Sequence, residues 1–416
     1  MRRWLALLAA AALTFIACSS SPGEMAIRVG AIYPLSGSQA QGGIDEHRGV
    51  LLAAELVNDD GGVDGRTIEI VSTDVPAAEA APGAIEDLGG DGIDVVIGSY
   101  GSTISAPASE TAAANGMLFW ETGAVGMLSE RSEQGVRTFR MPPTGAVLGR
   151  NAIEFMDGPL ARAFGRDPDE LRYAISFVDD VYGRSVAGGA SQAARELGLD
   201  VAGRFGYDLR SVDYDALALR IERSGADVLF VSAYLADAIG LRRALVRNDV
   251  DLLASIGTSS SYCMPEFGAA LGQGAVGLFA SDKPSGDAID PSTLRPGGGD
   301  LLERARAAYD ERWHEEMSPA ALAGFSAAWA LLAEIMPTAA ELSPEAIADA
   351  ALAIDLPVGS LPNGSGVRFG EPGTATAGDN VAAAAVIWEW MVPGEHMVVW
   401  PPALATHDVL PMDIAP

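Results

Sequence analysis

Lysine and cysteine are almost absent from this chain of 416 residues, and each absence limits what the protein does. Lys283 is the only lysine among 27 basic residues, against 56 acidic ones, and the formal net charge is −29. Nucleic-acid binding needs a clustered basic surface, so this composition argues against such a partner. Of the 2 cysteines, Cys18 lies in the N-terminal segment, so Cys263 has no partner for an internal disulfide and is predicted to be a small buried group.

The signatures of several catalytic and metal sites are missing as well. The 4 histidines show no metal-ligand spacing, either among themselves or with Cys263. A Walker-type phosphate loop is absent, because the only lysine lies in Asp282-Lys283-Pro284. The nearest approach to a nucleophile elbow, Gly183–Ala187, ends in alanine instead of glycine and begins well past the preceding strand. We therefore expect no enzyme, no metal and no cofactor.

The N-terminus is predicted to be a targeting segment. Met1-Arg2-Arg3 is positively charged, and Trp4–Ile16 is an apolar run too short to span a bilayer. Ala17-Cys18-Ser19 then resembles the cleavage site of a bacterial lipoprotein signal, although Phe15 stands where leucine is usual. We expect a signal peptide over residues 1–17 and a lipid-anchored linker over 18–26. An ordinary signal peptide with an incidental cysteine is the alternative.

The most informative stretch of the mature chain runs from Ile93 to Gly123. It reads as a buried strand, a glycine-rich turn, a helix over Ile104–Ala114, a second strand and a second polar turn. Ser102 or Thr103 is predicted to cap that helix. Such turns lie at the carboxyl ends of parallel strands, where open α/β sheets bind ligands.

The remainder of the chain predicts an α/β fold in two blocks. The order βαβαβαβ up to Trp120 implies a parallel sheet covered on both faces. A second alternating block follows from Arg137 to Ser281, and then the pattern changes to helices and a few short strands. The less regular expectations are a helix over 146–164 broken or kinked at Gly158-Pro159, a helix over 185–197, a strand over 274–281, a hairpin over 367–378, and terminal strands over 381–391 and 397–400.

Five short motifs together resemble the type I periplasmic binding proteins. The closest group is the branched-chain amino-acid and amide branch of the substrate-binding proteins of ABC transporters, and the resemblance spans Ile27–Pro402. Each motif is weak alone, but the five occur in the family's order. They are Ile32–Gly37, Asn58–Arg66, Val96-Ile97-Gly98, Asp180–Ser185 and Gly366–Phe369.

The resemblance implies two Rossmann-like lobes joined by three hinge crossings, with a ligand cleft between them. Lobe I would comprise residues 27–144 and 283–378, and lobe II residues 145–282 and 379–416. The family's function is to capture a small polar ligand (an amino acid, amide or small carboxylate) and deliver it to a membrane ABC permease. A monomer in the periplasm or at the cell surface, anchored through Cys18, would follow. A ligand-sensing receptor that uses the same cleft without transport is the alternative.

The resemblance also implies where the ligand lies. Ser102 and Thr103 correspond to residues that hold a ligand carboxylate at a helix start, which agrees with the preference of helix N-termini for anions. Tyr182 and Tyr234 correspond to aromatic residues of the second lobe, although either is equally explained as a rim residue packed on its own lobe. The full implied set is Ser36, Gly37, Ser102, Thr103, Glu121, Thr122, Gly123, Ala124, Tyr182, Tyr234 and Ser259.

One departure from the family concerns the charge that neutralises a ligand ammonium group. Amino-acid binders place an acidic residue after the strand that here ends at Ile256-Gly257, whereas this chain has Thr258-Ser259-Ser260. Glu121 or Asp237 is the candidate replacement. Either is equally explained as a capping or supporting carboxylate, so the class of ligand stays open at this point.

Overall fold

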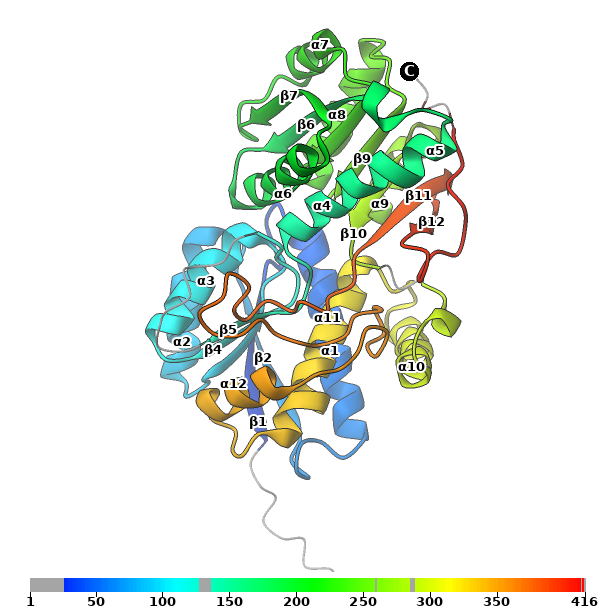
Figure 1. Cartoon of the computed structure of the whole chain (residues 1–416). Helices are drawn as coiled ribbons and strands as arrows, with labels where there is room; N and C mark the ends of the chain where they lie inside the picture. The colour runs from blue at the N-terminus through cyan, green and yellow to red at the C-terminus, as the bar shows by residue number, and fades with distance from the viewer. Residues whose placement is uncertain (1–25, 127–135, 259, 285–288, 413, 415–416) are drawn as a thin grey trace, which may run out of the picture.

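The computed structural model describes residues 26–126, 136–258, 260–284, 289–412 and 414, and it divides into two lobes, each built on one sheet. The first sheet, in the lower half of Figure 1, has the order β2-β1-β3-β4-β5, and all its neighbouring strands are parallel. Its strands are β1 (Ile27–Tyr33), β2 (Ile68–Asp74), β3 (Val95–Gly98), β4 (Leu118–Glu121) and β5 (Thr138–Arg140).

The second sheet has the order β12-β11-β10-β9-β8-β6-β7 and lies in the upper half of Figure 1. Strands β6 to β10 pair in parallel, whereas β10 with β11 and β11 with β12 are antiparallel. The C-terminal pair therefore extends the second sheet. The strands are β6 (Arg172–Val178), β7 (Asp200–Tyr207), β8 (Val228–Ser232), β9 (Ala254–Thr258), β10 (Phe279–Asp282), β11 (Val386–Val392) and β12 (Glu395–Trp400).

Helices cover both faces of the first sheet because its strands are apolar on both sides. On β1, Val29 and Tyr33 belong to the large core that α1 and α11 share, whereas Ile32 faces the smaller core under α2 and α3. The helices of this lobe are α1 (Ala40–Asp59), α2 (Ala81–Gly90), α3 (Ser102–Ala114), α10 (Pro296–Trp313), α11 (Pro319–Trp329) and α12 (Pro344–Ala353), with short 3-10 turns at Ala78–Ala80, Pro291–Thr293 and Met336–Thr338.

In the second lobe, α4 packs against α6, while α7 and α9 both contact α8. Asp180 and Asp213 begin two of these helices, each accepting a hydrogen bond from a backbone N–H of the first turn. The helices are α4 (Gly145–Phe155), α5 (Ala161–Ala163), α6 (Val181–Leu197), α7 (Tyr214–Ser224), α8 (Leu235–Arg247) and α9 (Pro265–Leu271), with 3-10 turns at Pro168–Glu170 and Gly272–Ala275.

The helices α1 and α11 approach closely because small residues face one another. A Cβ atom added to Gly49 of α1 would lie 2.0 Å from the carbonyl oxygen of Ala321, and one added to Gly324 would lie 2.1 Å from that of Glu46. Among the described residues, Pro319–Thr338 is long and apolar enough to cross a membrane, but 83% of that window is buried within the protein. It has the burial of a core helix.

Several element boundaries predicted from the sequence were wrong. The helix expected over 185–197 begins four residues earlier, at Val181, because Asp180 caps it. The strand expected over 274–281 is reduced to Phe279–Asp282, and Gly272–Ala275 forms a 3-10 turn instead. The hairpin expected over 367–378 makes only isolated bridges.

Of the break or kink expected at Gly158-Pro159, the break does not occur. The helix instead continues through a π-helical segment, Met156–Leu160, into α5. Proline lacks the backbone N–H of a regular α-helix, and a wider turn accommodates its ring within the helix. Helical structure is therefore continuous in the second lobe from Gly145 to Ala163.

Candidate functional site

A cavity of about 770 Å³ lies between the two lobes, within the range of small-molecule sites. Its walls come from segments that follow β1, β2 and β3 in the first lobe and β6, β7 and β8 in the second. Both sheets thus contribute the carboxyl ends of parallel strands, where open α/β sheets bind ligands. The lining residues are Ser38, Gln39, Pro76, Ala77, Ala78, Glu79, Thr103, Val178, Asp179, Asp180, Asp208, Leu209, Arg210, Tyr234, Leu235, Ala236, Asp237 and Ile239.

Acidic side chains dominate the wall of the second lobe. Asp179, Asp180, Asp208 and Asp237 line it, whereas Arg210 is the only basic residue among the described residues of the lining. The side chain of Arg210 is 92% exposed and pairs with Asp208, so its charge is directed to solvent. Asp179 likewise pairs with Arg184, so Asp180 and Asp237 are the two acids of this wall for which the described residues show no ion pair. These two residues give the wall its negative charge.

Asp237 is the buried member of this acidic group. It is fully buried at the start of α8, and its Oδ2 accepts a hydrogen bond from the hydroxyl of Tyr207. Its Oδ1 has no hydrogen-bond partner. Burial raises the pKa of Asp237 to about 6, against the opposing effects of the Tyr207 hydroxyl and of nearby backbone N–H groups.

Asp180 and Tyr234 form a second polar contact in the same wall. The Tyr234 hydroxyl donates to Oδ2 of Asp180 over 2.8 Å, while Oδ1 of Asp180 accepts from the backbone N–H of Gly183. Asp180 therefore has one oxygen committed to capping α6 and the other to a tyrosine. The ring of Tyr234 packs on Tyr182, with centroids 5.3 Å apart.

The first lobe contributes Gln39 and Thr103 from two different helix starts. Nε2 of Gln39 donates to Oγ1 of Thr103 over 3.1 Å, and Oε1 of Gln39 is buried without a hydrogen-bond partner. Glycine at position 101 allows this arrangement, because a Cβ atom there would lie 1.8 Å from Oε1 of Gln39. The side-chain amide of Gln39 is therefore held against the N-terminus of α3.

Among the residues implied by the family resemblance, the structure brings Thr103 and Tyr234 to the cavity wall. Ser36 and Gly37 are exposed beside it, and Ser36 is occupied by two hydrogen bonds to the carboxylate of Asp74. Ser259 and Cys18 lie outside the described residues. The other implied residues do not line the cavity and make contacts inside the lobes. They are Ser102, Glu121, Thr122, Gly123 and Ala124 in the first lobe and Tyr182 in the second.

Glu121 organises the second turn instead of facing the cavity. It is fully buried, and its Oε1 accepts hydrogen bonds from the backbone N–H groups of Gly123 and Ala124, at 2.7 and 2.6 Å. Its Oε2 accepts from the N–H of Ser99. The N–H groups of Gly123 and Ala124 and the carboxylate of Glu121 therefore satisfy one another. Of the two roles left open for Glu121, these hydrogen bonds favour the supporting one.

Thr122 belongs to a buried network with Tyr33 and Glu46. Its hydroxyl donates to Oε1 of Glu46 and lies 2.7 Å from the hydroxyl of Tyr33. All three residues are buried, and Oε2 of Glu46 has no hydrogen-bond partner. Thr122 is thus a supporting residue and does not line the cavity.

Ser102 and Tyr182 also act away from the cavity. The expected side-chain cap on α3 was wrong, because Gly101 is the N-cap residue and Oγ of Ser102 instead accepts from the N–H of Gly126. The hydroxyl of Tyr182 lies 2.8 Å from Oγ1 of Thr258, and its ring is 3% exposed. Tyr182 therefore packs behind Tyr234 and positions it.

Tyr100 is a residue that the sequence reasoning missed. It has φ +80°, which is unusual for a side chain of this size, and its ring sits against Gly42, where an added Cβ would lie 2.2 Å from Cζ. Its hydroxyl reaches Sδ of Met264 in the second lobe at 4.0 Å. Tyr100 thus fills the deep part of the space between the lobes. A tyrosine in a glycine-rich turn was the available signal.

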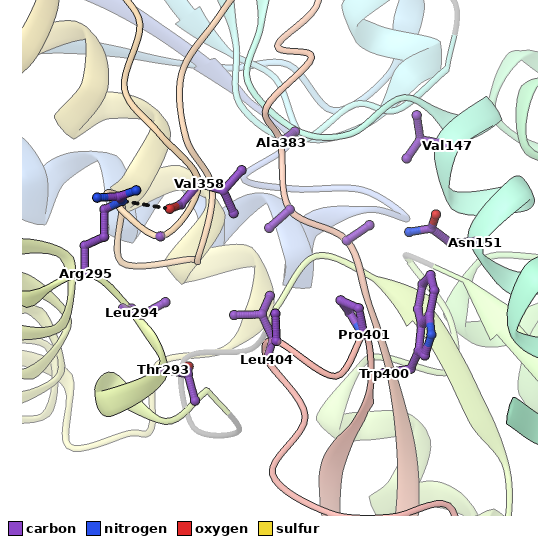
Figure 2. Close-up of a pocket in the computed structure, with 14 residues that line it drawn as sticks. Val147, Asn151, Thr293, Leu294, Arg295, Val358, Ala383, Trp400, Pro401 and Leu404 are labelled. Carbon is purple, nitrogen blue, oxygen red and sulfur yellow. Dashed lines mark hydrogen bonds between the residues drawn. The ribbon is translucent and has the colours of Figure 1, made fainter.

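Figure 2 shows a different cavity, of about 510 Å³, beside the segments that connect the lobes. Most of its labelled side chains are apolar, including Val147, Leu294 and Trp400. Its charged residue, Arg295, donates from Nε to the carbonyl oxygen of Val358 over 3.2 Å. This cavity lacks the convergent polar groups of the first one, so we do not regard it as the ligand site.

The buried carboxyl group of Glu46 predicts how stability depends on pH. Burial raises its pKa from 4.5 to about 8, against the attraction of Lys283. A raised carboxyl pKa stabilises the fold below the unfolded pKa, and this contribution is lost as pH rises through the folded pKa. We therefore expect the free energy of unfolding to fall between pH 6.5 and 8.5, and to fall less in Glu46→Gln.

Urea unfolding at several pH values measures this difference. The window begins at pH 6.5 because burial lowers the pKa of His47 to about 4, which has the opposite effect on stability below its ordinary value of 6.5. Burial also raises the pKa of Glu389 to about 7, but this group is common to both proteins. Equal slopes for the two proteins would contradict the prediction.

The family follows from comparison with known sequences. A family model described as periplasmic binding protein matches residues 26–385, and the chain belongs to this family. Leu/Ile/Val-binding protein homolog 8 of Brucella abortus is 29% identical over 348 residues, covering 83% of this chain and 84% of the relative. Homolog 7 of the same species is 25% identical over 416 residues, covering 98% and 99%.

Solved structures share the fold. The leucine-binding protein of Thermotoga maritima matches with a TM-score of 0.73 at 16% identity, covering 89% of this chain and 97% of that one. The branched-chain amino acid transporter substrate-binding protein of Streptococcus pneumoniae, in complex with isoleucine, gives 0.71 at 19% identity, covering 90% and 100%. The predicted type I fold, two Rossmann-like lobes with a cleft between them, is confirmed. The family and these relatives are substrate-binding proteins and not enzymes, which supports a solute-binding role outside the cytoplasm.

Proposed function

We propose that this protein is the extracytoplasmic solute-binding component of an ABC transporter. It captures a small polar ligand in the 770 Å³ cavity and delivers it to a membrane permease. The observation that carries the proposal is the position of that cavity, because it joins the carboxyl ends of parallel strands from both lobes. The relatives described as Leu/Ile/Val-binding proteins support the transport role, and those names apply to the relatives themselves.

Binding proceeds by closure of the two lobes over the ligand. We take lobe I as residues 27–144 and 283–378, and lobe II as 145–282 and 379–416. The chain crosses between the sheets after β5, after β10 and before β11. Three crossings restrict the relative motion of the lobes to a hinge, and contacts added on closure convert ligand binding into a change of shape. The permease would recognise the closed shape.

A lipid anchor on Cys18 would keep this binding protein, as a monomer, close to its permease. The support for it is the sequence Ala17-Cys18-Ser19 after a short apolar run. One acyl chain binds a membrane only reversibly, whereas several chains on one residue give stable attachment. The anchor places the protein in the periplasm or at the cell surface.

Thr103→Ala tests whether the cavity holds the ligand. The Thr103 hydroxyl lines the cavity at the start of α3, where a polar ligand group would meet it. Removing a hydrogen bond to a charged ligand group weakens binding by about 1.5–3 kcal/mol, or roughly 10- to 150-fold. Calorimetry with the solute found by a thermal-shift screen of amino acids, amides and short carboxylates measures the change.

Thr111→Ala is the matched control for this experiment. Thr111 lies on the same helix, donates its hydroxyl to the carbonyl of Pro107 and does not line the cavity. We expect the control to bind as tightly as the wild type. Unchanged affinity in Thr103→Ala would place the ligand elsewhere.

Uptake measurements separate transport from sensing. Cells that lack this protein should lose ATP-dependent uptake of the bound solute, and the gene should lie beside permease and ATPase genes. A receptor that only senses the solute would leave uptake unchanged. That result would favour the alternative function while leaving the binding site intact.

A further inference from the structure

We propose that the cavity selects a positively charged solute, whose ammonium or guanidinium group binds Asp237 and Asp180. This inference rests on the proposed solute-binding function and names the class of its ligand. It departs from the amino acids of the relatives, which carry a carboxylate as well as an ammonium group and have no net charge when their side chain is apolar.

The unsatisfied carboxylate oxygen of Asp237 is the first observation. Asp237 is fully buried and lines the cavity, and its Oδ1 has no hydrogen-bond partner. A buried carboxylate oxygen without a hydrogen-bond donor is costly. Proteins therefore pair such oxygens or leave them for a ligand. Its other oxygen is already held by Tyr207, which fixes the orientation of the carboxylate.

The acceptors on the opposite wall are the second observation. Oε1 of Gln39 in the first lobe is buried and has no partner either. Asp180 lies in the same wall as Asp237; each of its oxygens already accepts one hydrogen bond, from Tyr234 and from Gly183, and a carboxylate oxygen can accept a second. Both walls therefore carry oxygen acceptors, and an ammonium or guanidinium group has several donors with which to meet them.

The cavity provides much less for a ligand carboxylate. The N–H groups of Gly123 and Ala124 are taken by Glu121. Arg210 is paired with Asp208 and mostly exposed to solvent. The start of α3, with the Thr103 hydroxyl, is the remaining place for a polar or anionic group of the solute. A cation with a small polar end therefore fits the lining better than an anion.

A simpler role for Asp237 is to stabilise the start of α8, where its carboxylate meets the positive end of the helix dipole. Backbone N–H groups of Tyr234 and Asp237 do lower its pKa somewhat. This role does not explain why the aspartate borders a cavity with Asp180 and Asp208. The two roles differ in their effect on ligands, because only a binding role makes amine affinity depend on Asp237.

Calorimetry with defined probes tests the inference. We would use putrescine, agmatine and L-arginine as cations, L-leucine as a neutral amino acid, and glutarate as an anion, at low ionic strength. We expect at least one of the cations to bind more tightly than leucine or glutarate, and its binding to weaken as salt is added, since salt screens charge pairs.

Two variants locate the binding site of the cation. Asp237→Asn keeps the size of the side chain and an acceptor for Tyr207, and it should weaken cation binding by roughly 10- to 150-fold. Asp180→Asn retains a residue that caps helices and should also weaken binding. The control is Asp251→Asn in the same lobe, where the side chain is exposed and outside the cavity. Circular dichroism checks that each variant is folded.

Each outcome decides the proposal. Cation binding that is lost in Asp237→Asn or Asp180→Asn and kept in Asp251→Asn supports it. Tight leucine binding without cation binding overturns the inference but leaves the solute-binding function in place. Cation binding that neither cavity variant alters overturns the inference, as does the absence of binding by every cation. Failure of the proposed function is recognised separately: unchanged affinity in Thr103→Ala places the solute outside this cavity, and unchanged uptake in cells that lack the protein rules out transport.

Discussion

Replacing Arg140 by methionine is expected to lower the free energy of unfolding by about 3–5 kcal/mol, the usual cost of breaking a buried ion pair by removing one partner. Arg140 ends β5, where the chain leaves the first sheet, and its side chain is 4% exposed. Its Nε lies 3.0 Å from Oδ1 of Asp379, and Nη1 donates to the carbonyl of Val125. Methionine would remove the guanidinium group that pairs with the buried Asp379 beside the third crossing.

Urea unfolding followed by tryptophan fluorescence measures the loss. The double variant Arg140→Met with Asp379→Asn should recover part of it, because the second change removes the charge with which Arg140 pairs. Full additivity of the two changes, or a loss below about 1 kcal/mol, would mean that the pair contributes little. The result bears on function because this pair joins the first and third crossings between the lobes.

Lys283→Met is the second substitution with a large expected effect, again about 3–5 kcal/mol. The single lysine of the chain begins the second crossing, is 4% exposed, and donates from Nζ to the carbonyl of Gly123 over 3.3 Å. Burial alone would lower the pKa of Lys283, but the carboxylates of Asp282 and Glu46 raise it overall. Methionine would remove the cation that these buried acids face.

The same unfolding experiment tests Lys283→Met, with Arg184→Met as its control. Arg184 is 65% exposed and pairs with the exposed Asp179, so its replacement should cost no more than about 1 kcal/mol. Above the Glu46 pKa of about 8, combining Lys283→Met with Glu46→Gln should destabilise less than the sum of the two changes, since glutamine, unlike the ionised glutamate, needs no counter-charge. Equal losses for Lys283→Met and Arg184→Met would contradict the buried role.

Much of the fold was accessible from the sequence because its signals are local. The buried strand and the helix predicted within Ile93–Gly123 appear as β3 and α3. The boundary of α6 was missed because a single side-chain hydrogen bond from Asp180 sets it. The π-helical segment at Met156–Leu160 was missed because helix propensity alone does not reveal how a proline is accommodated.

The orientation of polar side chains was harder to predict than the fold, and Glu121 shows why. The sequence places Glu121 at the end of a strand, at the correct edge of the sheet. It does not show which way the carboxylate points. In the structure it turns inward and binds the N–H groups of Gly123 and Ala124. Asp237 was one of two candidates for a ligand charge, and its position in the cavity wall depends on how the two lobes meet.

The sequence by itself determined the α/β alternation, the turns at the strand ends and the family, because each depends on residues close together in the chain or on motifs in order. Only the tertiary structure decided which polar groups are already satisfied and which remain for a ligand. Asp237 depends on Tyr207, Arg140 on Asp379, and Lys283 on Glu46, and each pair is distant in the chain. The free energy of a polar group is set by burial and partners, and both arise only when the lobes are packed together.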